Sequence, residues 1–590
     1  MNHPTPAIVT QRAARPLPRW ALLLLCLAYV VPGFVGRDPW RNVDVASFGY
    51  MLELAQGRSH WLAPTLAGFT PDGDGLLAFW LGALALQWAP GWLAPEMAAR
   101  LPFIALLVLT LLATWYTVYY LARSPGAQPV AFAFGGEAHP KDYARSMADA
   151  GLLALLACLG LAQLSHEITS YLAQLACTAL VFFAAAIQPY HPRRAAVTMP
   201  LGMAGLVLAG APTLATLLGL GCAALAWWAP AHTADRRRTA ALAWAAATLA
   251  SMGLAWALDL WAWRIEPPQA FLPYATTMVR MLVWFGWPAW PLALWTLWRW
   301  RRQIASRTGH RHLWLPLWFT LVTLAATFTT QPADRALLLG LPALAVLAAF
   351  ALPTLERSIA ALIDWFTLLF FSVSAIAIWV VWISLHTGIP AQPAANVARL
   401  APGFIPRFDG LAFVLALAAT AAWCALVWWR AARHRTALWK SLVLPASGTT
   451  LAWLLLMTIW LPMLDYARSY APQVRQIVAT LGPQPGCVLT HNLGDSQVAA
   501  LQFHGHLALY PASAEPPQGC QWLAVGSDTN DLPDDLAQPA QWLPFAAIGR
   551  PTNRSERILL LKRLPRPLTK PPREPTTTGH EPNRPLALSR

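Results

Sequence analysis

Two acidic side chains lie directly after the first long apolar segment of the chain. Asp38 and Asp44 belong to the stretch Gly-Arg-Asp-Pro-Trp-Arg-Asn-Val-Asp, which ends at Asp44. A carboxylate at the edge of a hydrocarbon layer is poorly solvated, which suits a general base that accepts a proton from a hydroxyl or an amine. The same residues could instead cap the helix that follows and pair with Arg37 or Arg41. The residues alone leave both interpretations open.

Another acidic residue lies further along the chain, after a second apolar segment. Here the sequence reads His166-Glu167. Glu167 could assist Asp44 if the fold brings them together. His166 and Glu167 could also ligate a metal, although no further ligands stand at suitable spacing, and we expect no metal. A plain polar turn is the remaining interpretation.

Three arginines near the ends of apolar segments are candidates for binding an anion. A guanidinium presents paired N–H donors that match the oxygens of a lipid phosphate or pyrophosphate. Each arginine could equally be a residue whose long side chain only carries its charge to the membrane surface. The three candidates are Arg264, Arg280 and Arg335.

The elements that must position these groups are apolar segments long enough to cross a membrane. Hydrophobic residues make up 57% of the 590 positions and charged residues only 12%, which excludes a soluble multidomain enzyme. A bilayer core of about 30 Å requires roughly 17 to 25 apolar residues per helix, so the sequence predicts an all-α polytopic membrane bundle of about thirteen spans. The expected spans are 20–36, 101–121, 151–165, 171–187, 196–210, 213–228, 239–260, 283–298, 313–330, 336–352, 359–385, 411–429 and 442–461.

Arginine clusters between these segments indicate how the bundle is oriented. If the apolar segment 75–93 does not cross the membrane, all the clusters fall on the side of the N-terminal arginines, as the positive-inside rule requires. We therefore expect 75–93 to be an amphipathic or re-entrant helix that lies against the membrane. The carboxylates described above then face outward, which in a bacterium is the periplasm. The clusters also account for the net charge of +15 without a nucleic-acid partner.

The long apolar segments stop near residue 465, and a different pattern begins. Short strand-like runs bounded by Gly, Pro and Asp, together with one helical pattern, predict a small mixed α/β domain. The strand-like runs are 487–490, 506–510, 522–525 and 558–562, and the helical pattern is 473–481. Cys487 and Cys520 lie in this region, and an oxidising compartment would allow them to form a bridge.

These observations divide the chain into four parts. A tail dominated by Pro and Arg is expected to be disordered. The expected parts are a cytoplasmic N-terminus at 1–19, a transmembrane domain at 20–465 with an outward loop at 37–100, a periplasmic α/β domain at 466–563, and the disordered tail at 564–590.

Several motifs of the first outward loop and its surroundings form a recognisable set. They are Asp38-Pro39-Trp40, Asp44, Phe48-Gly49, the run 61–68, Phe79-Trp80-Leu81-Gly82-Ala83 and Ala98-Ala99-Arg100-Leu101-Pro102, with weaker matches at Asp334-Arg335 and 341–344. In this set the chain resembles bacterial GT-C glycosyltransferases of the aminoarabinose transferase (ArnT-like) and protein mannosyltransferase type. The similarity covers most of the chain.

The resemblance implies a fold, a reaction and a compartment. It implies a GT-C bundle in the bacterial inner membrane, with its C-terminal domain in the periplasm. The expected reaction transfers a hexosyl or pentosyl group from a polyprenyl (undecaprenyl) phosphate donor to lipid A or another lipid or glycan acceptor, as in lipopolysaccharide modification. The polyprenyl-phosphate sugar is then a substrate, and no other cofactor is expected.

The resemblance also suggests roles for individual residues. Asp44 falls at the acidic position of the family and would be the general base, with Glu167 and Asp38 as further catalytic candidates. The three arginines named above would bind the donor phosphate.

The chain departs from the family pattern at two places. Where the family has adjacent Asp-Glu, this chain has Val43-Asp44, and where the family has Glu-Lys-Pro-Pro, it reads Gly73-Asp74-Gly75-Leu76. A catalytically degenerate member that binds polyprenyl lipid or a partner protein is therefore the alternative. A transporter or flippase is disfavoured, because the spans carry almost no charge and show no paired broken helices.

Overall fold

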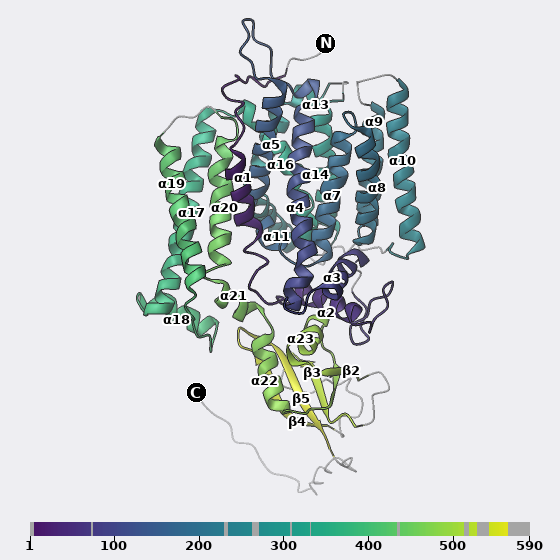
Figure 1. Ribbon diagram of the computed structural model, residues 1–590, viewed down its shortest axis with the longest axis vertical. Helices are drawn as coiled ribbons and strands as arrows, with labels where there is room; N and C mark the ends of the chain where they lie inside the picture. The colour runs from purple at the N-terminus through teal and green to yellow at the C-terminus, as the bar shows by residue number, and fades with distance from the viewer. Residues whose placement is uncertain are drawn as a thin grey trace, which may run out of the picture.

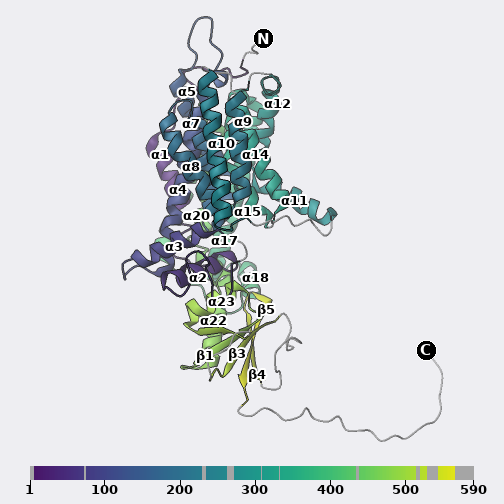
Figure 2. The same cartoon turned by 90° about the vertical axis from the view of Figure 1, so that its right-hand side faces the viewer.

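The chain folds into a long helical bundle that is joined at one end to a small β-sheet (Figure 1). The computed structural model describes residues 5–71, 75–228, 234–261, 271–306, 309–330, 332–432, 437–512, 519–527 and 542–564. The N-terminus lies at the end of the bundle opposite the sheet. Helices α12 and α13, which carry one of the arginine clusters, lie toward the same end (Figures 1 and 2). These two ends are called the sheet end and the N-terminal end below.

The first half of the bundle contains helices of very different length, from the 4 residues of α6 to the 28 of α4. Their bounds are α1 (Arg19–Val30), α2 (Val43–Ala55), α3 (Leu76–Trp88), α4 (Pro95–Ala122), η1 (Pro125–Ala127), α5 (Pro140–Ala157), α6 (Leu161–Leu164), α7 (Ser170–Ile187), α8 (Pro192–Leu208), α9 (Pro212–Trp228) and α10 (Ala234–Ala257).

The second half continues the bundle to the start of the C-terminal region. Its elements are α11 (Phe271–Phe285), α12 (Ala289–Arg299), α13 (Arg301–Ile304), α14 (Arg311–Thr329), α15 (Ala333–Leu338), α16 (Leu341–Ala351), η2 (Leu352–Thr354), α17 (Arg357–Thr387), α18 (Ala391–Leu400), α19 (Gly410–Ala432), α20 (Lys440–Leu456) and α21 (Leu461–Arg468).

The exact number of thirteen spans is not confirmed by the lengths of the helices. Among the described residues, six helices are long and apolar enough to cross a membrane, or seven if α20 and α21, which are bent by 69°, count as one. Several other apolar segments are divided. Within the expected span 283–298, for example, helix α11 ends at Phe285 and α12 begins at Ala289, and Gly286 and Pro288 lie between them. Glycine is conformationally free and proline lacks an N–H group, so both interrupt a helix.

Helices α2 and α3 lie together at the sheet end (Figure 2). The 13 residues of α3 extend about 20 Å at ~1.5 Å per residue, less than a bilayer core of ~30 Å. Gly82 allows α3 to pack closely on α2, because a Cβ atom at this position would lie 2.2 Å from the Met51 sulfur. A helix of this length does not cross a bilayer by itself, which agrees with the expectation for 75–93.

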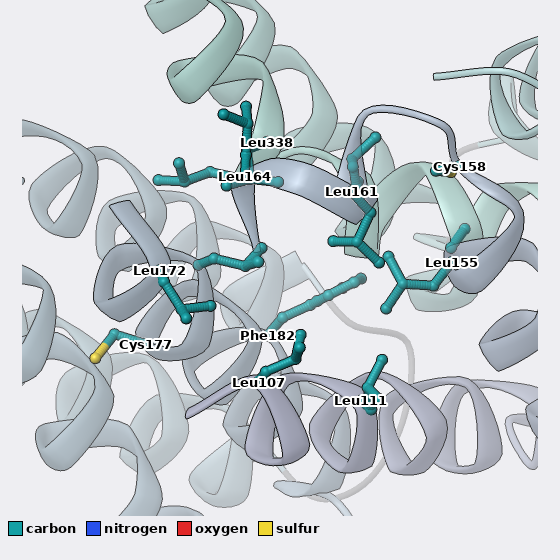
Figure 3. Packing of buried hydrophobic residues seen from close by; sticks show 14 of the residues in the cluster. Leu107, Leu111, Leu155, Cys158, Leu161, Leu164, Leu172, Cys177, Phe182 and Leu338 are labelled. Carbon is teal, nitrogen blue, oxygen red and sulfur yellow. The ribbon is translucent and has the colours of Figure 1, made fainter. Parts of the chain in front are cut away.

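The centre of the bundle is a continuous apolar core. Figure 3 shows part of it, where Leu107 and Leu111 of α4 face Phe182 of α7, with Leu155 of α5 close by. All four side chains are buried. Five cysteines are free, and three of them, Cys158, Cys177 and Cys222, are buried as small apolar groups.

The C-terminal region forms a five-stranded sheet with the order β2-β1-β3-β5-β4. Strand β1 pairs in parallel with β2 and β3, whereas β5 pairs antiparallel with both β3 and β4. Four strands and one helix agree with the sequence patterns, while α23 and β4 were not foreseen. The elements are α22 (Ala471–Leu481), β1 (Cys487–His491), α23 (Asp495–Gly505), β2 (Ala508–Pro511), β3 (Trp522–Ser527), β4 (Trp542–Arg550) and β5 (Asn553–Arg563).

A disulfide links Cys487, the first residue of β1, to Cys520 just before β3, with Cα atoms 4.9 Å apart. The predicted bridge is therefore confirmed. The expectation of disorder after residue 563 falls almost entirely on 565–590, which lie outside the described residues.

Candidate functional site at the sheet end

Three parts of the chain meet at the sheet end of the bundle: the segment between α1 and α2, the turn between α6 and α7, and helix α21. Helix α2, which follows the first of these parts, also contacts the C-terminal sheet region. The Tyr50 hydroxyl donates to Asp495 at 2.7 Å, and the rings of Phe48 and Phe503 meet edge to face at 4.8 Å. Helix α2, which carries Asp44 in its first turn, is thus fixed between the bundle and α23.

Asp44 is almost completely buried, with 1% of its surface exposed. One carboxylate oxygen accepts hydrogen bonds from Arg37 at 2.7 Å and from the backbone N–H of Trp40 at 3.0 Å. The other accepts the backbone N–H of Ile168 at 2.8 Å. Asp44 therefore connects the first loop to the residue that directly follows Glu167.

Burial alone would raise the pKa of Asp44, but its surroundings overcome this effect. The positive charges of Arg37 and Arg100 and the two backbone N–H donors hold the pKa below the ordinary value of 3.8. Asp44 is consequently an anion at neutral pH, and three donors already engage its oxygens.

Arg37 organises the loop around this anion. Its Nε donates to the carbonyl of Gly33 at 2.9 Å, and its Nη2 donates to the carbonyl of His166 at 2.7 Å. Arg100 of α4 donates a hydrogen bond to the Arg37 carbonyl at 2.7 Å. Two further nitrogens of Arg100 are buried without a hydrogen-bond partner in the described part of the chain. The site thus carries more buried positive than negative charge at this point.

Glu167 has a different environment from Asp44. One oxygen pairs with Nη2 of Arg335 at 3.1 Å, and the other accepts from Gln163 at 3.3 Å. Burial raises the pKa of Glu167 above its ordinary value of 4.5, although the positive charge of Arg335 opposes the shift. Asp44 and Glu167 also repel each other electrostatically, so the structure brings the two predicted carboxylates together. Of the two, Glu167 is the stronger base.

The side chain of His166 contacts backbone carbonyls in this structure. Its ring nitrogens face the carbonyls of Ala162 and Tyr29, and burial lowers its pKa to about 4. Gly33 is essential to this packing, since a Cβ atom there would lie 2.2 Å from the His166 ring. Among the described residues no group of three or more His, Cys, Asp or Glu side chains could hold a metal.

Asp38 links the first loop to α21. Its carboxylate accepts the hydroxyl of Ser469 at 2.8 Å, and its backbone N–H donates to Asp465 at 3.0 Å. The same oxygen of Asp465 accepts the indole N–H of Trp40 at 3.0 Å. The ion pair with Arg37 therefore belongs to Asp44, and Asp38 fixes the position of α21.

The three predicted phosphate-binding arginines do not lie together in the described structure. Arg335 lies in the site, where its Nη1 has no hydrogen-bond partner among the described residues and its guanidinium stacks 5.2 Å from the Tyr171 ring. Arg280, on α11, is exposed, and in Figure 2 the far end of α11 projects away from the bundle. Arg264 lies outside the described residues, so its place is not defined.

Arg468, at the end of α21, was not foreseen from the sequence. Its guanidinium lies 4.9 Å from the centre of the Trp40 ring and within electrostatic range of Glu167. Within the described ranges it makes no ion pair. Arg37, Arg100 and Asp465 were likewise not proposed as site residues. For Arg100 a signal existed, because a charge inside an apolar helix is costly and marks a paired or functional position.

The resulting site combines two carboxylates of unequal basicity with the guanidiniums of Arg335, which keeps an N–H group without a partner among the described residues, and of Arg468, which makes no ion pair with them. A carboxylate with a raised pKa can accept a proton from a hydroxyl or amine. Guanidiniums with unused N–H groups can hold a phosphate and stabilise the charge that it gains on departure.

Comparison with solved structures identifies the fold. The crystal structure of ArnT from Cupriavidus metallidurans bound to undecaprenyl phosphate matches with a TM-score of 0.59 and 15% identity over 92% of this chain and 98% of that one. Its apo state matches with a TM-score of 0.55 over the same shares of the two chains, again at 15% identity. The Archaeoglobus fulgidus oligosaccharyltransferase gives only 0.43, at 9% identity over 84% of this chain and 64% of the other. No family model matches the chain, and no curated protein sequence matches it.

The chain thus shares the GT-C fold of ArnT, and it is a mostly helical, multi-pass membrane protein with a small C-terminal sheet.

Proposed function

We propose that this chain is a membrane glycosyltransferase that transfers a sugar from an undecaprenyl-phosphate donor to a lipid or glycan acceptor. The observation that carries the proposal is the pair Asp44 and Glu167 at one end of the bundle, set beside Arg468 and Arg335, whose Nη1 has no hydrogen-bond partner among the described residues. Support comes from the fold, which is shared with a protein whose crystal structure holds undecaprenyl phosphate.

In the proposed reaction an acceptor hydroxyl or amine attacks the anomeric carbon of the donor sugar. The bond between this carbon and the phosphate oxygen breaks in an in-line, inverting displacement, and the lipid phosphate leaves with the bonding electrons. The acceptor proton passes to a carboxylate. Glu167 suits this role better than Asp44, because its pKa is raised toward the working pH.

Asp44 takes a second role in this scheme. It remains an anion that fixes Arg37, Trp40 and the turn before α7. Asp38 fixes α21 and so sets the position of Arg468. Arg335 and Arg468 would hold the donor phosphate. Where the family has a lysine, the sequence has Asp74, which lies outside the described residues.

We further propose that the sheet end faces the periplasm of a bacterial inner membrane. The arginine-rich connections at the opposite end support this orientation under the positive-inside rule. The sheet region at 466–563 would then be a periplasmic domain, and 20–465 the transmembrane domain. Lipid A is one acceptor that would be available there, and the transferred group would be a hexose or a pentose.

The alternative function is binding of polyprenyl lipid without catalysis. The observation in its favour is that three donors already occupy the oxygens of the buried Asp44. Incubation of the purified protein with a labelled undecaprenyl-phosphate sugar distinguishes the two. Release of free undecaprenyl phosphate that depends on acceptor supports the transferase. Binding of the labelled lipid without release supports the alternative.

A further inference from the structure

A second candidate site begins at the N-terminal end of the bundle, and neither Asp44 nor Glu167 lines it. A groove of about 1400 Å³ opens between α1, α19 and α20. Its walls are mostly apolar and include Leu24 and Ala28 of α1, Ala422 and Ala425 of α19, and Leu451 of α20. Leu24, Ala422 and Ala425 are exposed on the surface of the bundle, so the groove is open on the side that faces the membrane.

The groove has two positive charges at one end. Arg12 and Arg15 line it just before α1 begins, and both are exposed. The segment that carries them is held in place. The indole N–H of Trp439 donates to the Arg15 carbonyl at 2.7 Å, and the N–H of Leu438 donates to the Ala13 carbonyl at 3.0 Å. No acidic side chain is among the described residues that line the groove.

The length of the groove matches one leaflet of a bilayer. Along α20 its lining runs from Trp439 to Leu454, which is about 22 Å at ~1.5 Å per residue. A bilayer of ~40 to 45 Å, headgroups included, has leaflets of about 20 to 22 Å. A lipid that reaches from the membrane surface to the midplane would therefore fill the groove from its charged end to its apolar end.

We propose that this groove binds one anionic diacyl phospholipid from the leaflet at the N-terminal end. Arg12 and Arg15 contact its phosphate, and the acyl chains lie along α1, α19 and α20. The apolar walls alone would accept any lipid. Asp142 and Asp149 bond to Gln11 and to the N–H of Leu17, not to the arginines. Because Arg12 and Arg15 make no ion pair with a described residue and no described carboxylate lines the groove, they select a lipid with net negative charge. This site is independent of the transferase proposed above and does not require catalysis.

Native mass spectrometry of the full-length protein tests the proposal. The protein is reconstituted in nanodiscs that contain phosphatidylglycerol, phosphatidylethanolamine and undecaprenyl phosphate in equal amounts, and is then released in mild detergent. We expect one retained phosphatidylglycerol. In the double variant Arg12→Gln/Arg15→Gln its occupancy should fall about thirtyfold, the scale of two basic contacts to an anionic lipid.

Matched variants separate the site from general effects. Ala425→Trp adds bulk inside the groove and should also remove the lipid, whereas Ala421→Trp adds the same bulk at an exposed position that does not line it. Arg193→Gln/Arg194→Gln removes two exposed arginines outside the groove and should retain the lipid. Thermal unfolding shows that each variant is folded.

Three results would overturn the proposal. One is equal retention of phosphatidylglycerol and phosphatidylethanolamine by the unchanged protein. Another is retention of undecaprenyl phosphate in place of phosphatidylglycerol. The third is full phosphatidylglycerol occupancy in Ala425→Trp.

Discussion

Two groups of charged residues, one at each end of the bundle, have opposite environments. At the sheet end Arg37, Asp44 and Arg100 are buried and bonded to one another or to backbone carbonyls. At the N-terminal end Arg12 and Arg15 are exposed and make no ion pair with any described residue. Buried charges require defined partners because desolvation is costly, so they fix geometry. Exposed charges keep their water and are left to orient the chain and to meet the lipid surface.

The strongest test of this comparison is the orientation of the bundle, because the two ends must face different compartments. A reporter that is active only in the periplasm should give full signal when fused after Tyr470 and none after Arg238 or Arg302. The reason is the one-sided distribution of arginines. Signal after Arg238 would reverse the proposed orientation of the whole bundle.

Removal of one carboxylate should affect the reaction most strongly at the sheet end. Glu167→Gln keeps the shape of the side chain but cannot accept a proton, so turnover should fall by about 10² to 10⁴. Release of lipid phosphate measures it. Glu356→Gln is the matched control, since Glu356 is exposed and its side chain caps nothing. Near-normal turnover in Glu167→Gln would assign the base elsewhere.

Asp44→Asn should reduce stability as well as activity. The substitution leaves Arg37 buried at 4% exposure without its counter-charge, a change that typically costs about 3 to 5 kcal/mol. The unfolding midpoint in detergent measures this loss, with Asp38→Asn as the comparison because Asp38 has no ion pair among the described residues. If Asp44→Asn unfolds at the midpoint of the unchanged protein while losing activity, Asp44 acts chemically rather than structurally.

The disulfide should matter to the sheet region alone. Its Cys487–Cys520 loop spans 33 residues, so in the chain-entropy model Cys487→Ser/Cys520→Ser should lose about 3 to 4 kcal/mol. Cys424→Ser removes a free, exposed thiol and should change nothing measurable. Thiol labelling of denatured, unreduced protein gives a direct check, because only the five free cysteines should react. Labelling of all seven would exclude the bridge.

The smallest effect concerns pH. The folded pKa of Glu167 is raised above 4.5, so the active, ionised form is lost when the pH falls through this higher value. The acid limb of kcat/KM should therefore lie above pH 4.5. Arg335 lowers this pKa, so Arg335→Gln should move the limb to higher pH. If the acid limb of kcat/KM does not move in Arg335→Gln, the group that titrates is not Glu167.

Sequence patterns predicted the local features of the site and missed its long-range ones. Asp44 could be placed because it follows an apolar segment, and Arg37 was recognised as a pairing option seven residues away. The ion pair between Glu167 and Arg335 and the position of Arg468 near them depend on the packing of helices that are distant in the sequence. Hydrophobic periodicity within one segment does not predict such packing. Arg280 was chosen for its position at a span end, but its helix, α11, extends away from the bundle (Figure 2).

The fold shows the same division. Apolar length predicted a helical membrane bundle, but it did not predict that glycine and proline divide several of the expected spans into short helices. Short strand-like runs bounded by Gly, Pro and Asp located four of the five strands of the sheet. Helix α23 was missed because its small, polar and apolar residues give no clear helical face, and its packing on α2 makes it a helix in context.

The partners of the first loop are separated by most of the chain, and this has a consequence for biogenesis. Arg37 contacts the carbonyl of His166, 129 residues later, and Asp38 contacts Asp465 after 427 residues. Synthesis at roughly 5 to 20 residues per second places Asp465 in the chain tens of seconds after Asp38. A nascent chain in the translocon therefore has an unfinished site, and insertion of the last helices completes it. The order in which the helices enter the membrane therefore delays the assembly of the proposed site until the chain is nearly complete.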